Sequence, residues 1–193
     1  MSGILSVIET KNNDVKNSSL ELLSESQKIS SEKNLENNVI IIGELDEKNL
    51  NKLNQFGINS LLSGATSNID KYSPELYKNA ILIAINQLEP EIILFSGTSI
   101  GKDLAPRVAA NIKYNLVTEC IDISIKSDGF EIKRPIFAGK IIQTLKINEN
   151  GIVISLKTNT FKIERVQTNE PSINQINNKI INENKLPILK EII

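Results

Sequence analysis

The sequence predicts an α/β fold: a Rossmann-like parallel sheet flanked by helices and extended by an antiparallel β-meander. In the first 112 residues, apolar strand-like runs alternate with segments of helical period, which is typical of a parallel sheet. Runs such as Val39–Ile42 are continuously apolar, as expected for strands covered on both faces. From residue 116 to residue 156 the helical period disappears, and Asp128-Gly129, Ala138-Gly139 and Asn150-Gly151 mark turns between antiparallel strands.

The elements of the first half follow from these patterns. Ser18-Ser-Leu-Glu21 has the spacing of a capping box, and Ser73-Pro74 places a cap and a first-turn proline before a helix. The helix after residue 102 is expected to begin near Asp103, because Pro106 is tolerated only in a first turn. The expected strands are Gly3–Ile8, Val39–Ile42, Ser60–Leu62 and Glu91–Phe95, and the expected helices are 18–31, Glu47–Phe56, 74–88 and 103–112.

The second half is expected to hold strands at 117–126, 131–136, 140–147 and 152–157, some of which extend the edge of the parallel sheet. From Val166 the chain becomes polar, so we expect a domain over 1–165 and a linker over 166–193. The last residues, Leu186–Ile193, turn apolar again. They are typical of the opening of a further domain, and the alternative is a tail that docks back on the first one.

Composition excludes several functional classes. The 193 residues hold 22 basic and 23 acidic side chains, no histidine and one cysteine. A net charge of -1 argues against nucleic-acid binding, and the lack of histidine excludes a Ser-His-Asp triad and imidazole-bound metals. No segment is typical of a signal peptide or a membrane span, so we expect a bacterial cytoplasmic protein without membrane insertion. Cys120 is expected to be a packed core cysteine.

The loop Gly97-Thr-Ser-Ile-Gly101 fits two motifs incompletely. As a nucleophile elbow it lacks a histidine base, and Lys102 could replace one only if it were buried. As a phosphate loop it has the wrong glycine spacing, although Thr98, Ser99 and Lys102 could hold an anion at a helix N-terminus. The simpler interpretation is a tight turn in which Ser99 or Asp103 caps the helix. No catalytic or metal-binding set is predicted.

A longer motif resembles the N-terminal domain of the electron transfer flavoprotein alpha subunit. Residues 92–110 match a strand, a Gly/Ala-x-Ser-x-Gly-Arg/Lys-Asp/Asn loop and a Leu-x-Pro-Arg-Val-Ala-Ala helix. The match continues through Leu116–Cys120, Lys133–Gly139 and Ile154–Phe161, and it covers about residues 3–165. The sequence departs from the family pattern at Glu119, where Asp is usual, at Lys140, where Asn is usual, and at Lys157-Thr158, which replaces Arg followed by Pro or Gly.

This resemblance implies an electron carrier subunit without an active site of its own. In the family, FAD is bound mainly by a C-terminal domain that would follow Ile193, so no flavin is expected on this chain alone. The implied partners are a beta subunit in a heterodimer, flavoprotein dehydrogenases as donors and a quinone reductase or similar acceptor, as in fatty acid oxidation. The implied compartment is the cytoplasm, or the mitochondrial matrix in a eukaryote.

We place the expected beta-subunit contact on the loop and helix from Gly97 through Gly101 to Arg107, and on the strand edge from Arg134 to Gly139. The alternative that the residues leave open is a stand-alone nucleotide-binding α/β module.

Overall fold

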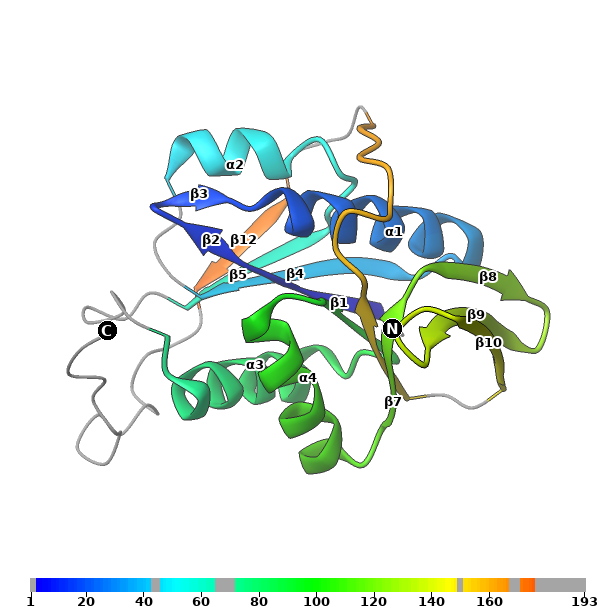
Figure 1. Cartoon of the computed structure of the whole chain (residues 1–193). Coiled ribbons are helices and arrows are strands. Elements are labelled where there is room, and N and C mark those ends of the chain that lie inside the picture. Colours follow the sequence, from blue (N-terminus) through cyan, green and yellow to red (C-terminus); the bar gives the residue numbers. More distant parts are fainter. Residues whose placement is uncertain (1–2, 43–45, 65–71, 149–150, 167–170, 176–193) are drawn as a thin grey trace.

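The computed structural model describes residues 3–42, 46–64, 72–148, 151–166 and 171–175, and a parallel sheet lies at their centre (Figure 1). Its strands are β1 (Gly3–Ile8), β4 (Glu36–Ile42), β5 (Ser60–Gly64), β6 (Ile92–Ser96), β7 (Asn115–Cys120), β11 (Ile152–Leu156) and β12 (Ser172–Gln175). Their order is β12-β5-β4-β1-β6-β11-β7, and every neighbouring pair is parallel. The predicted α/β class is confirmed.

Helices cover both faces of this sheet. On one face lie α1 (Asn17–Lys33) and α2 (Glu47–Leu53), and on the other lie α3 (Pro74–Leu88) and α4 (Ser99–Ile112) (Figure 1). Each face has its own apolar core, one containing Leu22 and Phe56 and the other Ile81 and Phe95. All six residues of β1 are buried, which explains why the strand is apolar without alternation.

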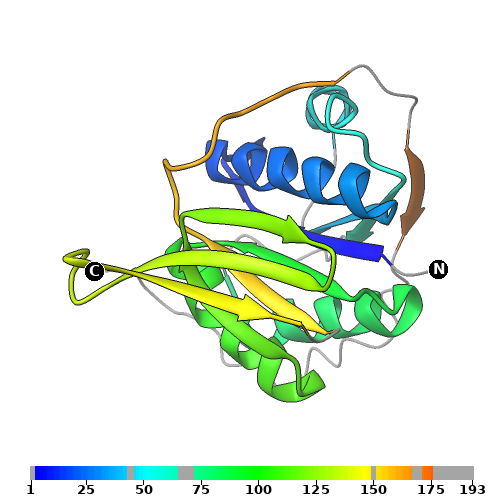
Figure 2. The same cartoon turned by 90° about the vertical axis from the view of Figure 1, so that its right-hand side faces the viewer.

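A smaller antiparallel sheet packs on the α1 side. It consists of β8 (Asp122–Lys126), β9 (Gly129–Ile136) and β10 (Ile141–Ile147), with β9 in the middle. Its buried residues Ile123, Phe130 and Ile132 belong to the same core as α1, and the Nζ of Lys33 lies 4.8 Å from the centroid of the Phe130 ring. The far end of the β9–β10 hairpin extends away from the body (Figure 2).

The predicted meander is only partly correct. The expected strand 117–126 is two strands in two different sheets, β7 and β8, which are separated at Ile121. The hairpin near Asp128 exists, but its turn residues are Ser127 and Asp128, and Gly129 has the positive φ of 145°. Strand β11 is not part of the meander, because it lies between β6 and β7 and runs parallel to both. All five of its residues are buried, as expected for a strand covered on both faces.

Two predicted helix starts are wrong. Helix α1 begins at Asn17 after Lys16, without a side-chain cap, so the capping box at Ser18–Glu21 does not form. Helix α4 begins at Ser99, because the side chain of Thr98 accepts a hydrogen bond from the backbone N–H of Gly101. Pro106 therefore lies inside the helix and not in its first turn.

After β11 the chain crosses α1 and returns to the opposite edge of the sheet. The carboxylate of Glu21 accepts hydrogen bonds from the backbone N–H groups of Asn159 and Thr160, at 3.2 and 3.1 Å. Further along, the N–H of Val166 donates to the carbonyl of Gln55 at 2.8 Å. Strand β12 then pairs with β5, so the sheet includes residues 172–175, which the sequence assigned to a linker.

The expected apolar segment 186–193 lies outside the described residues. Among the residues that the structure does describe, no helix has the length and apolar character needed to cross a bilayer.

Candidate functional site

The loop between β6 and α4 already has a carboxylate beside it. The hydroxyl of Thr98 donates to Oε1 of Glu9, and the other oxygen of that carboxylate lies 2.6 Å from the Nζ of Lys16. Glu9 is 7% exposed. A Cβ atom at Gly101 would lie 3.6 Å from Oε1 of Glu9, which places the carboxylate against the start of the helix.

This arrangement disfavours a phosphate at the loop, since a second anion would meet the buried carboxylate of Glu9. Of the three residues expected to hold an anion, Thr98 is engaged by Glu9 and Gly101, Ser99 is exposed, and Lys102 lies 3.2 Å from the Glu119 carboxylate. The anion site stays a prediction. The side chain of Lys102 is also more than half exposed, whereas the base that an elbow serine requires would have to be buried.

Gly97 and Gly101 are explained by close packing. A Cβ atom at Gly101 would lie 1.8 Å from the carbonyl oxygen of Ser96. A Cβ atom at Gly97 would lie 2.7 Å from the carbonyl oxygen of Leu156. The two glycines therefore allow the loop to pack against its own strand and against β11, in agreement with a tight turn, but the helix is capped by Thr98 and not by Ser99 or Asp103.

Arg107 faces α3. Its Nε donates to Asp103 at 2.8 Å, and the hydroxyl of Tyr72 donates to the other oxygen of Asp103 at 2.6 Å. Hydrogen bonds from Tyr72 and Arg107 lower the pKa of Asp103, while burial and the Asp103 hydrogen bond raise the pKa of Tyr72. Glu75 of α3 lies 3.8 Å from the Arg107 guanidinium. This network joins α3 to α4.

Arg134 and Gly139 lie on a different surface. They line an open cavity of about 460 Å³ at the base and loop of the β9–β10 hairpin. The full lining is Glu119, Arg134, Pro135, Ile136, Phe137, Ala138, Gly139 and Lys157. Arg134 and Gly139, two residues expected at the partner contact, thus lie at the same cavity. Lys102 is linked to this cavity by its ion pair with Glu119, which is part of the lining.

Glu119 is the residue that the sequence analysis did not select. It has a φ of 58° at an irregularity in the pairing of β7 with β11, a left-handed conformation that is uncommon for a non-glycine residue. Its carboxylate lies between Gly97 and Lys102. The signal in the sequence was the one charged residue of the segment Leu116–Cys120.

The outer part of this hairpin exposes large apolar side chains. Phe137 is 72% exposed, and Ile141 and Ile142 are each 50% exposed. We call residues 134–143 the projecting ribbon. Strand β8 pairs with β9 only between Gly129 and Lys133, so it does not support the ribbon.

The Cys120 thiol and a cluster of polar side chains near α2 contact other parts of this chain and are explained by the fold. Cys120 is fully buried, and burial raises the pKa of its thiol to about 12, which confirms a packed core cysteine.

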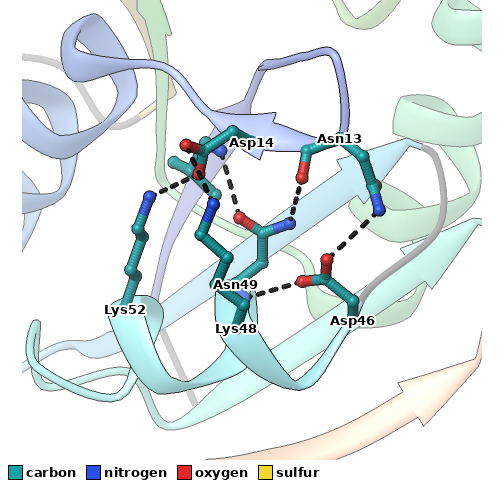
Figure 3. Close-up of polar contacts among 7 residues, drawn as sticks. Asn13, Asp14, Asp46, Lys48, Asn49 and Lys52 are labelled. Atoms are coloured by element: carbon teal, nitrogen blue, oxygen red, sulfur yellow. Dashed lines mark hydrogen bonds and ion pairs between the residues drawn. The ribbon is translucent and has the colours of Figure 1, made fainter.

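A cluster of polar side chains fastens the hairpin of β2 (Thr10–Lys11) and β3 (Asp14–Val15) to α2 (Figure 3). We call it the polar clip, and it consists of Asn13, Asp14, Asp46, Lys48, Asn49 and Lys52. Within the described part of the chain, no three metal-ligating side chains gather in a group.

The chain matches one family model and several curated relatives. The model of the electron transfer flavoprotein domain matches residues 4–181. The alpha subunit of Thermoanaerobacterium thermosaccharolyticum electron transfer flavoprotein is 30% identical over 139 residues, which are 72% of this chain and 42% of that protein. The Clostridium acetobutylicum alpha subunit is 27% identical over 150 residues, 77% of this chain and 45% of that protein.

A third relative is the acryloyl-CoA reductase electron transfer subunit beta of Anaerotignum propionicum, 28% identical over 109 residues, which are 56% of this chain and 30% of that protein. The chain thus spans less than half the length of the curated relatives that it matches. Together with the parallel sheet and its glycine loop, these matches show that the chain belongs to the electron transfer flavoprotein domain family, as the N-terminal domain of an alpha subunit.

Proposed function

We propose that this chain is the partner-binding scaffold of an electron transfer flavoprotein and that it associates with a beta subunit through the projecting ribbon. The observation that carries the proposal is the exposure of Phe137, Ile141 and Ile142 on a ribbon whose residues 134–139 line a cavity that also contains charged side chains. Contiguous exposed apolar side chains with a polar rim are typical of protein interfaces. The ribbon has apolar residues on both faces, because successive residues of a strand point in opposite directions.

In this proposal the flavin is held mainly outside these residues. The β6–α4 loop is the place where an α/β domain would bind the pyrophosphate of FAD, but here Glu9 adds negative charge and Thr98 is already engaged. The residues present therefore do not fit the dinucleotide at this loop. The same geometry gives no support to a stand-alone nucleotide-binding module.

The physiological setting is proposed from the family. The complete protein would accept electrons from flavoprotein dehydrogenases, such as those of fatty acid oxidation, and pass them to a quinone reductase or a similar acceptor. It would do so in the bacterial cytoplasm, without membrane insertion and as a carrier, not a catalyst. In that process this chain serves as a scaffold and binds the beta subunit.

The proposal is tested by expressing the chain with and without the electron transfer flavoprotein beta subunit of the same organism. We expect the two to co-elute in size-exclusion chromatography, and the chain alone to show no flavin absorption in its visible spectrum. A chain that is purified alone and already contains a tightly bound flavin would overturn the assignment of the flavin to other residues. Failure of the unaltered chain to bind the beta subunit would overturn the assignment as a partner-binding scaffold.

The position of the contact is tested by comparing two surfaces. The double variant Phe137→Ser, Ile142→Ser removes apolar area from the ribbon, and we expect it to weaken association strongly. Arg107→Ala alters the α4 surface, where the side chain faces Asp103 and Glu75, and we expect association within about two-fold of the unaltered chain. If Arg107→Ala weakened binding more than the ribbon variant did, the contact would lie on α4 instead.

A further inference from the structure

The cavity beside the projecting ribbon has more positive than negative charge. Lys102, Arg134 and Lys157 surround the single carboxylate of Glu119, and Lys140 follows in the loop of the ribbon. The ion pair with Lys102 balances the carboxylate. Among the described residues, no carboxylate lies within ion-pair distance of Arg134, Lys140 or Lys157.

Arg134 is the centre of this imbalance. Its Nε is buried, and no described residue accepts a hydrogen bond from it. A buried donor without an acceptor lowers stability, whereas a carboxylate placed beside a guanidinium forms a short charge-assisted hydrogen bond. Arg134 thus offers a buried donor without a described partner, while Oε1 of Glu119 in the same lining makes an ion pair with Lys102 but no hydrogen bond to a described residue.

The backbone at Glu119 explains why the internal carboxylate does not fill this role. Its φ of 58° places a non-glycine residue in the left-handed region. The side chain is thereby held against the Gly97 loop, with Oε1 at 3.2 Å from the Nζ of Lys102. Strain of this kind persists where the surrounding structure requires it, often at a binding site.

The apolar surroundings identify the class of ligand. An isolated two-stranded ribbon is only marginally stable in water, and the exposed Phe137 of this one lines the cavity, while Ile141 and Ile142 follow on β10. A free phosphate would neutralise Arg134 but leave Phe137 and Ile141 exposed. A protein segment would cover both kinds of surface at once.

We infer that the cavity accepts an aspartate or glutamate side chain of the beta subunit, which pairs with Arg134 and Lys157 while the ribbon packs against neighbouring apolar residues. The inference rests on the proposed function, because it requires a beta subunit as the partner. It adds the chemistry by which the partner is recognised: one acidic side chain of the beta subunit in the cavity, next to the apolar contacts of the ribbon. Such centrally buried charge pairs carry a large share of the affinity at interfaces.

The test measures the affinity of the beta subunit for charge variants of this chain. Arg134→Glu and Arg134→Gln should each weaken binding by about 30-fold or more, with the reversal the larger effect, and Lys157→Glu should act in the same direction. The matched control is Lys146→Glu. Lys146 is an exposed residue of β10 that lies opposite Glu131 in the strand register and outside the cavity lining, and the affinity of this variant for the beta subunit should stay within about two-fold of that of the unaltered chain. Circular dichroism melting shows whether each variant is folded.

The outcomes separate the two claims. If the unaltered chain does not bind the beta subunit, the proposed function fails. If it binds and Arg134→Gln is as tight as Lys146→Glu, the inference of an acidic partner side chain is wrong while the proposed function survives. Tight binding of inorganic phosphate to the free chain, lost in Arg134→Gln, would identify a small-anion site and would also overturn the inference.

Discussion

The β2–β3 hairpin and the projecting ribbon are both two-stranded, but they differ in whether their buried polar groups have hydrogen-bond partners within the chain. In the polar clip, Asn49 is fully buried and bonds both to the backbone N–H of Val15 and to the backbone carbonyl of Asn13, at 3.1 and 2.9 Å (Figure 3). In the ribbon, the Nε of Arg134 is buried without a described acceptor, and Phe137 is exposed. The comparison teaches that a hairpin satisfied within its own chain stabilises the fold, whereas one left unsatisfied is available to a partner.

The strongest test of this contrast is Asn49→Ala. The substitution leaves the buried N–H of Val15 and the partly buried carbonyl of Asn13 without this partner. We expect the free energy of unfolding to fall by about 2–4 kcal/mol, as measured by urea denaturation. Lys48→Ala is the control, because Lys48 makes only an exposed ion pair with Asp14, and it should change stability by less than about 0.5 kcal/mol. Equal effects of the two variants would show that the clip is not what holds this hairpin.

A smaller effect is expected from acid. A hydrogen bond from Lys52 is the main reason that the pKa of Asp14 lies below its ordinary value of 3.8. Because the folded pKa is the lower one, this contact stabilises the folded clip fully above about pH 4 and is lost as the pH falls through the lowered pKa. A carboxyl NMR titration should show the lowered value, and Lys52→Met should move it back toward 3.8. An unchanged titration in Lys52→Met would remove Lys52 as the cause.

The smallest effect on stability is expected at the ribbon. Phe137→Ser in the free chain should change the melting temperature hardly at all, because a side chain that is 72% exposed contributes little to the core. The same variant should weaken binding of the beta subunit. A large loss of stability in the free chain would mean that the ribbon is supported by its own domain, and the contrast with the polar clip would disappear.

Sequence patterns predicted the elements that are decided locally. The apolar runs of β1, β4 and β6, the first-turn Pro74 and the end of β9 near Ala138-Gly139 all depend on neighbouring residues, and they were found. The capping box failed because Glu21 binds a segment about 140 residues away, which no local pattern contains. Strand β11 was assigned to the meander because its partners, β6 and β7, are distant in the chain.

The candidate site was predicted only in part, because some of its contacts join residues that are distant in the chain. The family motif selected Arg134 and Gly139, and the structure places them at one cavity. It also selected Arg107, whose side chain faces the other way, toward Asp103. The role of Glu119 depends on a left-handed backbone and on its distance from Lys102, which are properties of the folded chain alone.

The late insertion of β11 between β6 and β7 affects how the protein must be made. Until residue 152 leaves the ribosome, β6 has an open hydrogen-bonding edge on the side that β11 later covers, and β7 has no neighbour in the parallel sheet. An apolar edge of that kind is the part of a nascent chain most prone to join another chain. Synthesis that stalls before Ile152 should therefore yield aggregates, while release a few residues after Leu156 should yield a closed sheet on this side.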